Sequence, residues 1–184
     1  EFLSDSLKGQ FNYQNILASY ATSKILNLDT KFFLSTVKTF SGLPHRFEHI
    51  FENEKMLIIN NSKATNFDSA IKTIKNFDNV FLILGGRIKN NNFSIFKKVK
   101  KNISRCFVIG ESTDLIYDQI SDLFFSFKNF TLENAIDQIF LELKKIETKV
   151  TIILAPACSS FDQFINFEHR GKKFKEIIMK KLHL

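Results

Sequence analysis

The segment NNSKATN (residues 60–66) places small polar residues and Lys63 between an apolar run and a helical pattern. Backbone N–H groups at a helix N-terminus attract anions, and a neighbouring ammonium group strengthens that attraction. The segment therefore predicts a turn that binds a phosphate or a carboxylate. On these residues alone, a capped helix with a solvated lysine is the alternative.

A second turn of this kind, GGRIK (residues 85–89), follows the apolar run VFLIL (residues 80–84). Two consecutive glycines allow the backbone to turn sharply and to approach a ligand, and Lys89 can hold a carboxylate. A plain turn between a strand and a helix fits the same residues. The segment is not a P-loop, because the sequence contains no GxxxxGK[ST] motif.

The segment APACSSFDQFINFEHRG (residues 155–171) follows the apolar run VTIIL (residues 150–154). Small residues and hydroxyl groups that open a helix can bind a carboxylate or a phosphate. Phe164, Phe167 and Phe174 recur at helical spacing, and we expect them to face a core.

The turn GLPHR (residues 42–46) combines a glycine that ends a helix with a proline, a histidine and Arg46. The residue before a proline is driven out of the helical region, so we expect a hinge or domain boundary near Pro44. Movement about such a hinge can carry Arg46 onto a phosphate. A surface turn is the alternative interpretation.

The elements that must position these turns are two helices followed by an α/β unit. Apolar residues recur at helical spacing over residues 12–40, and two short runs around a polar four-residue loop suit a hairpin at 47–60. Continuous apolar runs, typical of strands covered on both faces, occupy residues 80–84, 106–109 and 150–154, with a weaker candidate at 123–127. This order predicts a Rossmann-like, mostly parallel sheet with flanking helices, and a boundary between residues 1–44 and 45–184.

Three helix starts carry sequence signals. Thr65 has an acid three positions later and precedes an apolar pattern, as an N-terminal cap does. Thr131 precedes the next helix in the same way. The last helix is expected to run over residues 161–181.

Composition narrows the classes of protein. The net charge of +7 comes largely from lysines scattered along the expected helix faces, which favours a solvated surface over a nucleic-acid footprint. Cys106 and Cys158 lack metal-ligand spacing and a His and acid arrangement, so we expect buried free thiols and no metal site. No apolar run approaches the roughly 18 residues of a membrane span, so a cytosolic location is expected.

Taken in order, GLPHRFE, NNSKATN, LILGGRIK and APACSSFDQFINFEHRG resemble segments of the Mur ligase family, and the opening GQFNYQN is similar to its GxHNxxN segment. The last string points to the members that add D-glutamate to UDP-N-acetylmuramoyl-L-alanine in peptidoglycan synthesis. The resemblance implies a cytoplasmic, ATP-dependent enzyme of three domains that phosphorylates a carboxylate, which the amine of D-glutamate then attacks. Residues 1–44 would be the last helices of its central ATP-binding domain, and residues 45–184 its C-terminal domain.

The resemblance also implies a binding site for D-glutamate. Lys89 and Thr65 would contact its α-carboxylate. Ser160, with the backbone near Phe161 and Phe167, would contact its side-chain carboxylate. Cations and helix-end N–H groups form charge-assisted hydrogen bonds of the kind that two carboxylates need.

By the same resemblance, four residues would contact ATP. Arg46 and Lys63 would lie near its phosphates and act in catalysis, Asn61 near its ribose, and Asn15 near its adenine. Asn61 stands where the family usually has Asp, and it can still form hydrogen bonds but carries no charge. Phe11 and Ala155 likewise replace a usual His and a usual Ser.

The parts that the resemblance places upstream include the P-loop, the Mg²⁺ ligands and the UDP-binding domain. These residues would therefore supply the D-glutamate site and part of the nucleotide lid, would hold no Mg²⁺ themselves, and would be inactive alone. Two alternatives fit the same features: another amide ligase of the Mur type, and a non-catalytic α/β binding module.

Overall fold

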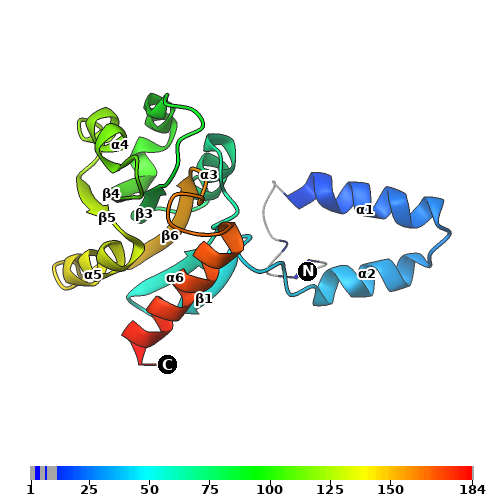
Figure 1. Ribbon diagram of the computed structural model, residues 1–184. Helices are drawn as coiled ribbons and strands as arrows, with labels where there is room; N and C mark the ends of the chain where they lie inside the picture. Colours follow the sequence, from blue (N-terminus) through cyan, green and yellow to red (C-terminus); the bar gives the residue numbers. More distant parts are fainter. Residues whose placement is uncertain (1–2, 5–6, 8–11, 184) are drawn as a thin grey trace. The chain divides into compact units, whose positions relative to one another are not determined.

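The computed structural model describes residues 3–4, 7 and 12–183, and the chain divides into two compact units, Glu1–Leu43 and Pro44–Leu184 (Figure 1). Residues 9–11 of the segment GQFNYQN lie outside the described residues. They include Phe11, where this chain departs from the usual His of the family.

The first unit contains the two predicted helices, α1 (Tyr13–Ile25) and α2 (Thr30–Thr39). Asp29 caps α2, since its Oδ1 accepts a hydrogen bond of 2.7 Å from the backbone N–H of Lys31. Of the side chains described in this unit, those of Ser23 and Val37 are buried. Large apolar side chains that remain exposed include those of Leu17, Ile25 and Phe32.

The second unit is built on a six-stranded sheet with the strand order β1-β2-β6-β3-β4-β5. Its strands are β1 (Glu48–Glu52), β2 (Met56–Asn60), β3 (Val80–Gly85), β4 (Ile103–Ile109), β5 (Ser126–Phe130) and β6 (Val150–Ala157). Only β1 and β2 pair antiparallel, as the predicted hairpin, and all the other pairs are parallel. The predicted α/β class with a mostly parallel sheet is confirmed.

Several strand bounds differ from the prediction. Strand β4 begins at Ile103 and not at residue 106, β6 continues past residue 154 to Ala157, and β3 ends one residue later, at Gly85. The strand expected at 123–127 begins at Ser126 instead, because the carbonyl group of Ile120 accepts hydrogen bonds from the N–H groups of Leu123 and Phe124 and holds both in the turn after a helix. Strand β1 begins one residue late because Phe47 has a positive φ of 53°, which a strand does not allow.

Helices cover both faces of the sheet, as Figure 1 shows. They are α3 (Phe67–Ile74), the 3₁₀ helix η3 (Phe93–Asn102), α4 (Thr113–Ile120), α5 (Leu132–Leu143) and α6 (Phe167–Leu182). Alternate residues of β3 enter different cores: Leu82 packs with α3, η3 and α4, whereas Phe81 packs with α5 and α6. Strands covered in this way are apolar throughout, which is why their runs are continuous.

The starts of two helices differ from the prediction, and the capping residue explains each difference. The cap of α3 is Asn66 and not Thr65, because Asn66 Oδ1 accepts from Ser69 N at 2.9 Å while Thr65 is held in the preceding turn. Helix α6 begins at Phe167, later than expected, because Asn166 Oδ1 accepts from His169 N at 2.7 Å and starts the helix there. The cap predicted at Thr131 is confirmed.

The structure bears on two expectations that came from composition. Cys106 and Cys158 are both buried and free, as predicted. Within the described ranges, no helix combines the length and the apolar character needed to cross a membrane.

Candidate functional site

Three of the predicted turns leave the same edge of the sheet. Because β2, β6 and β3 run parallel and in register, with Asn60 beside Leu154 and Gly85 beside Ala157, their carboxyl ends meet. Ligands of open α/β sheets bind at this edge. The segments 60–66, 85–89 and 155–171 are thus brought together.

The turns after β3 and β6 are joined directly through their backbones. Arg87 N donates to Ser159 O at 2.9 Å, and Ser159 N donates to Arg87 O at 3.0 Å. Gly86 makes this approach possible: its φ is 129°, and a Cβ built on it would overlap the carbonyl oxygen of Ser159. The glycines predicted to allow a sharp turn serve to bring two loops together.

Lys63 lies in the turn after β2 with its backbone fixed and its charge unneutralised. Its N–H donates to His45 O at 3.1 Å, and its carbonyl oxygen accepts from Thr65 N at 2.8 Å. Its Nζ lies 4.1 Å from the centre of the Phe167 ring. Among residues 3–4, 7 and 12–183, no carboxylate forms an ion pair with it.

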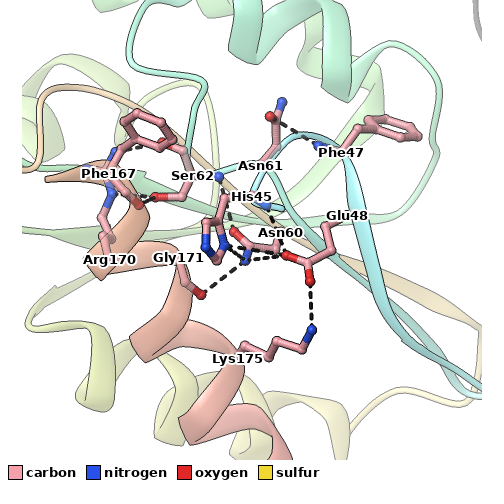
Figure 2. Close-up of polar contacts among 10 residues, drawn as sticks. All are labelled: His45, Phe47, Glu48, Asn60, Asn61, Ser62, Phe167, Arg170, Gly171 and Lys175. Atoms are coloured by element: carbon pink, nitrogen blue, oxygen red, sulfur yellow. Dashed lines mark hydrogen bonds and ion pairs between the residues drawn. The ribbon is translucent and has the colours of Figure 1, made fainter. Parts of the chain in front are cut away.

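Arg170 links this turn to the turn after β6, and Figure 2 shows its contacts with Ser62. Its guanidinium Nε donates to Ser62 Oγ at 3.0 Å, Nη2 donates to Ser62 O at 3.0 Å, and both Nη atoms lie 3.3 Å from Cys158 O. Ser62 Oγ in turn donates to Phe167 O at 2.8 Å. Arg170 is 1% exposed, and this burial lowers its pKa to about 10, so the side chain stays protonated at neutral pH.

Asn61, predicted to lie near the ribose of ATP, is buried and engaged with the protein. Its Oδ1 accepts from Phe47 N at 3.3 Å (Figure 2). Its Nδ2 donates to Thr73 Oγ1 at 2.6 Å. Contact with a nucleotide through the Asn61 amide would therefore use the second lone pair of Oδ1 or the second N–H of Nδ2.

A polar cluster beside this turn connects β1, β2 and α6 (Figure 2). Asn60 Nδ2 lies 2.9 Å from His45 Nδ1, 3.1 Å from Glu48 Oε2 and 3.1 Å from Gly171 O. The donor and acceptor roles of Asn60 Nδ2 and His45 Nδ1 depend on the tautomer of the histidine ring. Lys175 Nζ donates to Glu48 Oε1 at 2.7 Å. The cluster fixes the start of the second unit against α6.

Glu48→Gln is expected to remove a pH-dependent part of the stability. Burial alone would raise the pKa of Glu48. Hydrogen bonds from the Lys175 ammonium and from the backbone N–H of His45 outweigh the effect of burial and lower that pKa below 4.5. A lowered carboxyl pKa stabilises the fold above about pH 4.5, and this contribution is lost as the pH falls through the folded-state pKa.

Urea unfolding at about pH 6 and about pH 3 measures this contribution. Wild type is expected to be more stable than Glu48→Gln near pH 6, with a gap that narrows near pH 3. Glu54→Gln, an exposed change in the hairpin loop, is the control and is expected to show no such gap. A gap for Glu48→Gln that is equal at both pH values would contradict the assignment.

The other predicted site residues differ in exposure. Lys89 and Arg46 are exposed, and Phe161 is 61% exposed. Ser160 is buried, and its carbonyl oxygen accepts hydrogen bonds from the backbone N–H groups of Gln163 and Phe164. Asn15 lies in α1 of the first unit and is exposed.

Burial also determines the state of Cys158. It raises the pKa of the thiol to about 12, so the group is neutral and a poor nucleophile near pH 7. Among the described residues, no group of three or more His, Cys, Asp or Glu is placed to hold a metal ion.

No protein-family model matches the chain. Curated relatives do: the chain is 39% identical over 163 residues to a UDP-N-acetylmuramoylalanine--D-glutamate ligase from Wolbachia sp. subsp. Brugia malayi. It is also 37% identical over 182 residues to the ligase of the same name from Prochlorococcus marinus. The chain resembles the C-terminal portion of these ligases.

The alignments cover most of this chain but only part of each ligase. They include 89% and 96% of the chain, against 33% and 39% of the length of the two ligases. The chain therefore spans about a third of the length of the curated relatives it matches.

Two solved structures share the fold of the chain. Folylpolyglutamate synthase from Thermotoga maritima has a TM-score of 0.57 and 16% identity, covering 94% of this chain and 39% of that one. A pseudomurein peptide ligase type C from Methanothermus fervidus has a TM-score of 0.59 and 20% identity, covering 94% and 36%. At these identities the two structures support the fold alone.

Proposed function

We propose that the chain is the part of an ATP-dependent UDP-N-acetylmuramoylalanine--D-glutamate ligase that binds D-glutamate and covers the nucleotide. The observation that supports this most is the convergence of the segments 60–66, 85–89 and 155–171 at one edge of the parallel sheet. The same three segments carry the resemblance to the D-glutamate-adding ligases, which the curated relatives are named for.

In this proposal the chain contributes binding and orientation. Lys89 and Thr65 hold the α-carboxylate of D-glutamate, and the turn at Ser160, Phe161 and Phe167 holds its side-chain carboxylate. With both carboxylates fixed, the amine has one direction in which to attack an activated carboxyl group. Such orientation accounts for a large part of the rate of many enzymes.

The cationic residues have the second role. Lys63 and Arg46 offer positive charge to an anionic oxygen of ATP or of an acyl phosphate, the intermediate that the family resemblance implies. Asn15 and Asn61 complete the nucleotide contacts in the proposal. ATP supplies the phosphoryl group, and UDP-N-acetylmuramoyl-L-alanine is held by residues beyond this chain, as is Mg²⁺. The chain alone is then inactive.

Lys89→Ala is expected to weaken binding of D-glutamate about tenfold or more, because a charge-assisted hydrogen bond to a carboxylate is lost. Calorimetric titration of the chain with D-glutamate measures this affinity, and L-glutamate tests whether the site selects the enantiomer. Lys98→Ala, an exposed lysine on η3, is the matched control and is expected to leave the affinity unchanged.

Two results would count against the proposal. A chain that binds neither enantiomer of glutamate lacks the assigned site. A chain whose affinity is the same with Lys89 and with alanine at that position has its glutamate site elsewhere.

A further inference from the structure

Lys63 is held by an aromatic ring and not by an acid. The 4.1 Å between its Nζ and the centre of the Phe167 ring is within the range of a cation–π interaction. Both side chains are half-buried, which strengthens such a contact relative to a fully exposed pair. No carboxylate among the described residues competes with the ring for the ammonium.

The choice of partner has a chemical consequence. A carboxylate would orient Lys63 but would also neutralise it and compete with an anionic ligand. The face of Phe167 attracts the ammonium through its quadrupole and carries no net charge. It leaves N–H donors of the ammonium free for an oxyanion.

Both ends of this contact are fixed in place. Lys63 N donates to His45 O, and the next residue, Ala64, accepts through its carbonyl oxygen from Ala157 N at 2.8 Å. Phe167 is the first residue of α6, and its carbonyl oxygen accepts from Ser62 Oγ at 2.8 Å. Since both backbones are held, the ring determines where the Lys63 ammonium points.

We propose that Phe167 is a positioning residue. Its ring holds the charged Lys63 ammonium where it can bind an oxyanion of the ligand at this edge of the sheet. The inference rests on the proposed function, because that function makes Lys63 face a ligand. It gives the side chain of Phe167 a role separate from the contact expected of its backbone.

A spectroscopic test reports on the contact itself. In proton NMR of the whole chain, the ε-methylene protons of Lys63 are expected to resonate upfield, as protons above an aromatic face do. The upfield shift is expected to disappear in Phe167→Leu and to persist in Phe167→Tyr, which keeps the ring. Phe164→Leu, a half-buried phenylalanine of the same loop, is the control and is expected to leave the shift in place. An unshifted resonance in wild type, or one that Phe167→Leu does not change, overturns the inference.

A binding test reports on the role. Phe167→Leu is expected to weaken binding of D-glutamate, or of inorganic phosphate in a separate titration, roughly two- to fivefold. The titration that responds identifies the oxyanion as a carboxylate or a phosphate. Phe167→Tyr is expected to restore the affinity, and Phe167→Leu is expected to add no loss in a Lys63→Met background.

The outcomes separate this inference from the proposed function. Binding that responds to Lys89→Ala but not to Phe167→Leu overturns the inference and leaves the function standing. Losses that add fully in the double variant also overturn it, because the ring would then act without Lys63. Failure of the chain to bind glutamate removes the proposed function, whereas the position of the Lys63 resonance still decides whether the ring holds the ammonium.

Discussion

Gly86→Ala is expected to lower the free energy of unfolding of the α/β unit by at least about 3 kcal/mol. The φ of 129° at Gly86 is a conformation that side chains of L-residues rarely adopt. An added Cβ would also overlap the carbonyl oxygen of Ser159, which is backbone and cannot swing aside. The loops after β3 and β6 must then separate and break the hydrogen bonds between Arg87 and Ser159.

Urea unfolding followed by far-UV circular dichroism measures this effect. Asn91→Ala, an exposed change in the loop that follows the same strand, is the control and is expected to alter stability by less than about 0.5 kcal/mol. The separated loops carry Lys89 and Ser160, so the proposed function predicts that Gly86→Ala also weakens binding of D-glutamate. A Gly86→Ala chain as stable as the control would show that the two loops do not need this approach.

The sheet could be predicted because its signal is local. In VFLIL and VTIIL every position is apolar, and the structure shows why: Leu82 faces one core and Phe81 the other. The order of strands and turns then placed three polar segments at the carboxyl edge, since parallel strands end together. That much of the candidate site follows from the sequence and from general rules of α/β sheets.

The bonds within the candidate site could not be predicted in the same way. Arg170 and Ser62 are 108 residues apart in the sequence, and nothing near Arg170 distinguishes a buried guanidinium from a solvated one on a helix. The contact of Asn60 with Gly171 spans 111 residues. The cap at Asn66 could not be predicted for a different reason, because Thr65 and Asn66 are both good caps. The hydrogen bond from Thr65 N to Lys63 O holds Thr65 in the preceding turn and leaves Asn66 as the cap.

Arg170→Ala is expected to cost about 3–5 kcal/mol of the stability of the α/β unit. The guanidinium satisfies the carbonyl oxygens of Ser62 and Cys158 and the hydroxyl oxygen of Ser62, all at buried residues. Each buried acceptor left without a donor costs about 1–3 kcal/mol, and alanine also leaves a cavity where a large side chain was. Arg170→Lys is expected to recover only part of the loss, since an ammonium lacks the planar fork that reaches both turns.

Lys172→Ala separates the loss of these bonds from the loss of a charge on α6, because Lys172 is exposed on the same helix. It is expected to change the stability by less than about 0.5 kcal/mol in the same urea titration. The bond to Ser62 predicts coupling as well: the costs of Arg170→Ala and Ser62→Ala are expected to sum to more than the cost of the double variant, because both remove one network. If the costs were strictly additive, or if Arg170→Ala were as mild as Lys172→Ala, the guanidinium would not be what joins the turns after β2 and β6.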